Sequence, residues 1–141
     1  MQPEERRIQR LRRLERLRAI AKRQLAAETA EAEGVLAQLR SLTERTRSLA
    51  EDYATRGDAL DGYALTQSCR FAAGLCQIVN SSGKEAANAQ VLADRKMTEL
   101  AAAERRRAAV EQRLDLEQKA IVKRKEIRAG DARRKFGTEL E

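Results

Sequence analysis

A seven-residue repeat of apolar side chains runs through most of this chain and restricts its possible folds more than any other feature. From Leu11 to Tyr53, and again from Leu65 to Ile121, apolar residues recur at alternating steps of three and four. This spacing places them along one side of an α-helix and is the signature of a coiled coil. Composition agrees, because 36% of the residues are charged, 3% are aromatic and only one is proline, a mixture typical of long helices.

The two repeats differ in the residues that fill them. The first is rich in leucine, whereas the second is rich in alanine and serine, which bury less area per layer. Arginine occupies one a position in each repeat, where a charge reduces stability. The predicted core is Leu11, Arg18, Leu25, Ala32, Leu39, Thr46 and Tyr53 (a) with Leu14, Ala21, Glu28, Val35, Leu42 and Leu49 (d), followed by Leu65, Ala72, Val79, Ala86, Ala93, Leu100, Arg107, Leu114 and Ile121 (a) with Ser68, Leu75, Ser82, Ala89, Lys96, Ala103, Val110 and Glu117 (d).

The segment TRGDALDGYAL separates the two repeats and carries turn signals. Gly57 suits a helix C-terminus, and Asp58 or Asp61 can cap the next helix. A rival break is NSSGKE at 80–85, where Ser82 and Glu85 have capping-box spacing. We favour the first turn because it pairs large residues near it, such as Leu42 with Leu75, and also sets Leu25 beside Ala93.

The predicted fold is therefore all-α, an elongated antiparallel two-helix coiled-coil hairpin. It forms a single coiled-coil domain over residues 1–141, with a helix over about 4–56, a turn at 57–62 and a second helix over about 63–136.

Charge is unevenly distributed along the sequence. Residues 1–24 carry nine basic and three acidic side chains, residues 25–104 carry eight and twelve, and residues 105–141 carry twelve and seven. An antiparallel hairpin brings both basic segments to the end opposite the turn. We expect that end to attract acidic surfaces and to be poorly satisfied alone.

Several functional classes find no support in the residues. The longest apolar run, FAAGLC at 71–76, is far short of the roughly 20 residues that cross a bilayer, and no secretory or mitochondrial leader is recognisable. Cys69 and Cys76 are too far apart on a helix for a disulfide, and we expect reduced structural thiols in a cytoplasmic protein. The chain has no histidine and no nucleotide or nucleophile motif, so we expect no metal, no cofactor, no small-molecule substrate and no enzyme activity.

Two regions remain as candidate interaction sites. In the basic N-terminal segment, Leu17 and Ile20 fall outside the core positions and either lie under arginine stems or contact a partner. Near the turn, Phe71 and Ile78 lie on the flank of the second repeat, either as extra core or as a partner site. Nucleic acid is the main alternative partner, but single-strand binders use stacking aromatics and none lie in the basic runs, so any such binding should be non-specific. Binding to a membrane surface ranks third, since no Trp or Phe anchors the basic helix.

The stretches LRSLTERTRSLAEDY, GYALTQSCRFAAGLCQIV and KRKEIRAGDARRKF, in this order and spacing, resemble the FliJ family of flagellar type III export proteins. The resemblance covers nearly the whole chain. It implies an antiparallel coiled coil similar to the stalk of rotary ATPases, which inserts into the hexameric export ATPase ring and touches the membrane export gate protein. It also implies a non-enzymatic cytoplasmic protein at the inner-membrane export apparatus, with substrate chaperones as further partners.

The resemblance assigns residues to the gate contact, and the charge distribution assigns residues to the ring contact. The gate patch of the family matches Leu42, Phe71 and Leu75, while two aromatic positions of the family appear here as Arg45 and Leu49. Ile78, on the same flank, completes the expected gate site. The expected ATPase-ring site combines the most basic end with its off-core aliphatics: Arg12, Arg13, Arg16, Leu17, Ile20, Arg105, Arg106 and Arg113.

Overall fold

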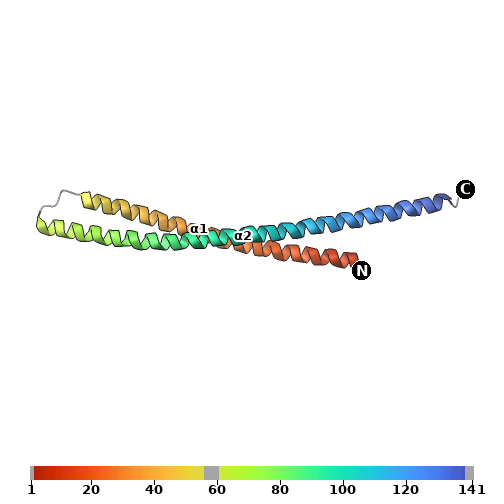
Figure 1. Ribbon diagram of the computed structural model, residues 1–141, viewed down its shortest axis with the longest axis horizontal. Coiled ribbons are helices and arrows are strands. Elements are labelled where there is room, and N and C mark those ends of the chain that lie inside the picture. Colours follow the sequence, from red (N-terminus) through yellow and green to blue (C-terminus); the bar gives the residue numbers. More distant parts are fainter. Residues whose placement is uncertain (1, 56–60, 139–141) are drawn as a thin grey trace. The chain divides into compact units, whose positions relative to one another are not determined.

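The computed structural model describes residues 2–55 and 61–138, and nearly all of them lie in two long helices. Helix α1 spans Pro3–Thr55 and helix α2 spans Gly62–Thr138. The helices pack against each other in opposite directions (Figure 1), and the described residues include no strand. The prediction of an all-α, two-helix hairpin is confirmed.

Local interactions explain where the helices begin and end. Pro3 occupies the first position of α1, where its missing N–H costs nothing, and the Glu5 carboxylate accepts a hydrogen bond from the Gln2 N–H at 3.3 Å. The Thr55 hydroxyl donates to the Glu51 carbonyl at 3.0 Å in the last turn. Asp61 caps α2, since its Oδ1 accepts a 2.7 Å hydrogen bond from the Ala64 N–H. Of the two predicted capping aspartates, Asp61 therefore performs the role.

The predicted turn at 57–62 falls largely on residues 56–60, which lie outside the described part of the chain. The rival break at 80–85 lies inside α2, which continues through it. Ser82 is not a cap there, because it is buried and its hydroxyl is bonded to Thr43 of α1. The observed helix ends differ from the predicted ones by one or two residues.

The helix pair divides into two compact units. Unit 1 combines residues 1–25 with 100–141, and unit 2 comprises residues 26–99. Unit 1 thus contains both basic segments, as the antiparallel arrangement requires. It holds 21 Lys or Arg against 11 Asp or Glu, whereas unit 2 holds 8 against 11.

In unit 2, the buried residues of α1 agree with the predicted a positions and differ from the predicted d positions. The predicted a positions Ala32 and Thr46 are buried, but the second buried line lies four residues after each a position instead of three. It consists of Thr29, Leu36, Thr43 and Ala50. The α2 surface opposite is built of small residues, including Ala86, Ala89 and Ala93, and it admits small side chains at close approach. The predicted d residues Val35, Leu42 and Leu49 are consequently displaced to the flank, where each is more than 40% exposed.

The pairing of the helices is also shifted from the predicted one. Ala93 packs against Ala32 and Leu36 instead of Leu25, which is a shift of one heptad. The rings of Tyr53 and Phe71 meet edge to face with centroids 4.6 Å apart. The α2 core assignment is confirmed by burial of Leu75, Ser82, Ala93 and Ala103, although Leu65 is exposed.

Polar contacts between the helices fix this register. In unit 2, Thr43 Oγ1 donates to Ser82 Oγ at 2.8 Å in a buried layer, and Lys96 Nζ lies 2.9 Å from Glu28 Oε2. In unit 1 the helices are joined by four ion pairs. These are Arg7–Glu117, Lys22–Glu104, Glu15–Arg107 and Glu4–Arg124.

Arg107 occupies a core position and was expected to be poorly satisfied. Its Nη2 atom lies 3.4 Å from Glu15 of α1, and its Nε atom lies 3.1 Å from Glu111 one turn along α2. The Nε atom is buried and donates no well-directed hydrogen bond. The expectation holds in part, because Nε makes no well-directed hydrogen bond, whereas Glu15 supplies an opposite charge that sequence spacing alone did not reveal.

The Glu15–Arg107 pair provides a test of the register. Glu15→Arg should lower the free energy of unfolding by about 1 kcal/mol, because two cations then face each other at a half-buried position. The double variant Glu15→Arg with Arg107→Glu should recover at least half of that loss in urea denaturation. A double variant as unstable as the sum of its two single variants would show that these residues are not neighbours.

Lys96 provides a test by pH. The hydrogen bond that Lys96 donates to the Glu28 carboxylate is the largest cause that raises the pKa of Lys96 above its ordinary 10.5. Because the folded pKa exceeds the unfolded one, the stabilisation is complete below about pH 10.5 and disappears as the pH rises through the folded value. The difference in melting temperature between the wild type and Lys96→Met should therefore shrink between pH 10 and 12. A difference that stays constant over this range would contradict the assigned contact.

Candidate functional site

Unit 1 carries a set of exposed arginines that form no ion pair among the described residues. All six arginines of the predicted ring site are exposed, and none has a carboxylate partner among the described residues. Leu17 and Ile20 accompany them at 63% and 60% exposure, so the alternative of burial under arginine stems does not hold. We call these residues the basic surface: Arg12, Arg13, Arg16, Leu17, Ile20, Arg105, Arg106 and Arg113.

The basic surface surrounds unit 1 instead of forming one patch. Residues seven apart keep the same side of a coiled-coil helix, so Arg106 and Arg113 share one side of α2. Arg12 lies on the other side of the helix pair, toward the Lys22–Glu104 ion pair of the same unit. Arg13 and Arg105 point away from the interface, each on its own helix. Positive charge is therefore available from every direction around this helix pair.

Other basic residues of unit 1 have a structural role instead. Arg7, Lys22, Arg107 and Arg124 form the ion pairs between α1 and α2. Their charges are balanced by carboxylates within the unit, so the basic surface accounts for much of its excess charge. Side chains at the end of α2 form a further basic region, because those from Val122 to Gly137 are all exposed.

Unit 2 presents an apolar surface on one side of both helices. The predicted gate residues Leu42, Leu49, Phe71 and Ile78 are between 41% and 48% exposed. Val35 and Leu92, each 46% exposed, continue the same heptad lines by one or more further turns. We call this surface the apolar stripe: Val35, Leu42 and Leu49 of α1 with Phe71, Ile78 and Leu92 of α2.

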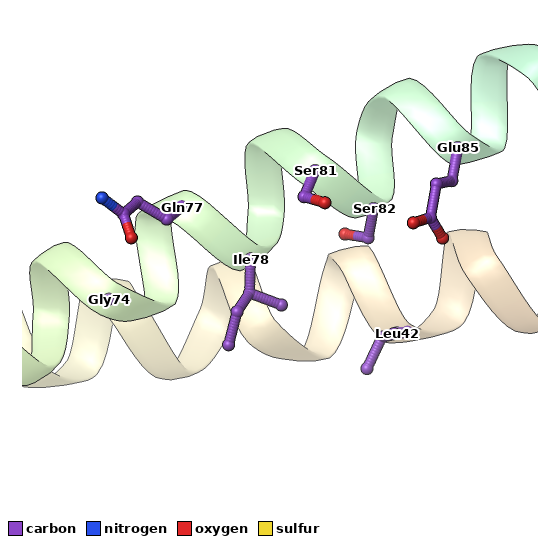
Figure 2. Close-up of a pocket in the computed structure, with 7 residues that line it drawn as sticks. All are labelled: Leu42, Gly74, Gln77, Ile78, Ser81, Ser82 and Glu85. Carbon is purple, nitrogen blue, oxygen red and sulfur yellow. The ribbon is translucent and has the colours of Figure 1, made fainter.

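A shallow groove runs along the middle of the apolar stripe. Figure 2 shows Leu42 and Ile78, one from each helix, directed to the same side of the pair. Ser82 closes the groove between the helices, and Glu85 lies at its edge. A second hollow farther along contains Val35 and Leu92. The two α-helices thus bring together residues 36 positions apart in the sequence, Leu42 and Ile78, to form one continuous surface.

Two predicted gate residues differ from the others. Leu75 is 8% exposed, because it occupies a core position, and it supports the stripe from beneath without reaching a partner. Arg45 lies beyond the stripe on the outer side of α1, where its Nε donates to the Ser41 carbonyl at 3.4 Å. The structure therefore brings Leu42 and Ile78 together in one groove. Leu49 and Phe71 lie one heptad farther along the same lines of α1 and α2, and Leu75 lies in the core below.

Sequence reasoning missed three members of this site. Val35 was assigned to the core, Leu92 received no role, and Glu85 was considered only as part of the rival helix cap at 80–85. A signal was present for the two residues of α2, because Phe71, Ile78, Glu85 and Leu92 follow one another at exact heptad spacing. Glu85 is exposed and has no cation within ion-pair distance in the described chain. It is the one charged position in an otherwise apolar line from Phe71 to Leu92.

The opposite side of unit 2 has a different character. Arg40 is hydrogen-bonded to Gln90 across the helices, and the hollow beyond it is lined by Arg47, Ala54 and Cys76. Both Cys69 and Cys76 are free and exposed, so neither thiol is part of the core. This side combines small and polar residues and lacks a continuous apolar line.

Residues 2–55 and 61–138 form neither a metal-ligand cluster nor a membrane-spanning helix. No group of three or more potential metal ligands occurs there, and neither helix contains a stretch apolar enough and long enough to cross a bilayer. Comparisons with protein-family models, with curated proteins and with solved structures find no match. The functional proposal consequently depends on the two surfaces.

Proposed function

We propose that this protein is a non-enzymatic component of a type III protein export apparatus, with the flagellar apparatus as the leading case. In this role it is a cytoplasmic stalk that binds the hexameric export ATPase through the basic surface and the membrane export gate protein through the apolar stripe. It acts at the inner membrane and needs no cofactor. Substrate chaperones are further candidate partners, as the family resemblance implies.

The observation that carries the proposal is the distribution of unpaired arginines around unit 1. A partner that contacts a helix pair from every direction encloses it, as a ring does. Arginines on one side only would instead suit a flat or grooved partner. Exposed charge also speeds the encounter with an acidic surface, and the exposed Leu17 and Ile20 supply apolar contact once the surfaces meet.

The apolar stripe supports a second, separate contact. Its residues lie in unit 2, where acidic side chains outnumber basic ones, so attraction there depends on apolar area. Contiguous exposed apolar surface on a soluble protein marks an interaction site. Two surfaces of different chemistry in different units are what a protein that connects two partners requires.

Nucleic acid is the second candidate partner, and the excess of ten positive charges in unit 1 favours it. Phosphate contacts alone give weak, salt-dependent and sequence-independent binding. The described basic surface contains no aromatic side chain to stack on bases, and the apolar stripe would have no use in such a complex. This candidate therefore explains less of the structure.

The basic surface can be tested by charge reversal. The triple variant Arg12→Glu, Arg13→Glu and Arg16→Glu should associate with the host's export ATPase at least tenfold more slowly at low salt, because the electrostatic attraction is removed. The defect should shrink as salt is added, since screening weakens the wild type as well. Stopped-flow association with purified ATPase measures both effects.

Matched controls separate the two surfaces and the two candidate partners. Phe71→Ala should leave ATPase association unchanged and weaken binding to the gate protein. Competition among defined DNA sequences at physiological salt should reveal no preference. A folded triple variant that still binds and stimulates the ATPase normally would disprove the assignment of the basic surface.

A further inference from the structure

The apolar stripe is longer than the gate patch that the family resemblance implies. It extends along α2 from Phe71 to Leu92, which corresponds to about 30 Å at the rise of an α-helix. On α1 it extends from Leu49 to Val35, which was not expected to be exposed. A surface of this length and narrow width matches the side of a partner helix better than it matches a loop or a compact domain.

We infer that the stripe binds one amphipathic α-helix of another protein, which lies along α1 and α2 as a third strand of the coiled coil. The inference rests on the proposed function in that the export gate protein is taken as the source of this helix. Each exposed line of the stripe has heptad spacing, as in the knobs-into-holes packing of three helices. The helix would have about 20 residues, with apolar side chains repeated every seven.

The amount of exposed apolar area is sufficient for one docked helix. A large apolar side chain has on the order of 150 Å² of accessible surface. Six of them at just under half exposure therefore present roughly 400 Å². Stable protein interfaces bury about 800 Å² on each partner, of which a little over half is apolar, so the stripe supplies about the apolar area of one such contact. A patch of this size lies within the range that is often functional in a monomer.

Glu85 specifies the chemistry of the helix. It lies at the edge of the groove beside Ser82, at the α2 position between Ile78 and Leu92. A docked helix would partly remove its carboxylate from water, and an unpaired charge in that setting is costly. The bound helix should therefore carry one Lys or Arg at the level of Glu85, within an otherwise apolar line. This residue would select the partner and fix its position along the stripe.

The inference can be tested with synthetic helices and with the gate protein together. Two fluorescent peptides of three heptads have leucine at their core positions and differ at one central core position, which is Lys in one and Glu in the other. Anisotropy titrations with the full chain should show at least fivefold tighter binding of the Lys peptide to the wild type. The Glu85→Lys variant should reverse this preference, because the sign of the pairing is inverted.

A second set of variants tests the length of the stripe outside the family-implied patch. The double variant Val35→Ser and Leu92→Ser should weaken binding of the Lys peptide about tenfold. Met97→Ser is the matched control, because Met97 is similarly exposed at 52% and lies on the heptad line of Cys76 and Gln90, on the opposite side of unit 2. It should change the affinity less than twofold. Circular dichroism establishes that each variant is folded.

The same variants are then measured with the cytoplasmic region of the export gate protein. Peptides that bind the wild type equally, or that ignore the Val35 and Leu92 changes, would overturn the inference. A gate region that binds the wild type but is insensitive to changes at Val35, Glu85 and Leu92 would also overturn it and leave the proposed gate contact intact. A gate region that does not bind at all, while the peptides behave as stated, would refute the proposed gate contact and leave the docking surface standing.

Discussion

The register of α1 against α2 depends on polar pairs between the helices, because their apolar layers would pack nearly as well in another register. Alanine layers such as Ala86, Ala89 and Ala93 would pack almost equally well if α2 were displaced by one heptad, because each buries little area and has little shape. The Thr43–Ser82 hydrogen bond in unit 2 and the Glu15–Arg107 ion pair in unit 1 would both be lost by such a displacement. Polar groups in a coiled-coil interface commonly select the register at some cost in stability. The exposed surfaces described above exist only in this register.

The fold class was predictable from the sequence, whereas the detailed packing was not. Heptad periodicity and the absence of proline after Pro3 are local properties, and they determine that the chain forms long helices. The orientation of α1 depends on its partner. Leucine was placed in the core at Leu42 and Leu49 because it is the more hydrophobic choice, yet the narrow α2 surface accepts Thr43 and Ala50 and leaves those leucines on the flank. The size of the facing α2 residues, and not the hydrophobicity of leucine, therefore determines which α1 side chains are buried.

The candidate site shows the same division between local and non-local information. Exposure of the six arginines in the basic surface follows from charge alone, so their positions were predictable. Their freedom from ion pairs was not, because Arg107 and Arg124 are chemically identical to Arg106 and Arg113 and differ only in reaching Glu15 and Glu4 on α1. The heptad shift between predicted and observed pairing decides which arginines have such a carboxylate. Charge pairs could have served as a register restraint, since the observed alignment satisfies four of them in unit 1 alone.

The displacement of leucine from the α1 core connects packing to function. A helix pair that buried Val35, Leu42 and Leu49 would gain roughly 1 kcal/mol for each, since burial of the remaining half of a large apolar side chain is worth about that amount. The observed packing leaves this free energy unused within the chain and available to a binding partner. Phe71, Ile78 and Leu92 of α2 are also about half exposed, and all six side chains face the same side of unit 2. Turning these side chains inward would stabilise the isolated hairpin but would remove the exposed surface. The small core and the apolar stripe therefore both result from the small residues at the helix interface.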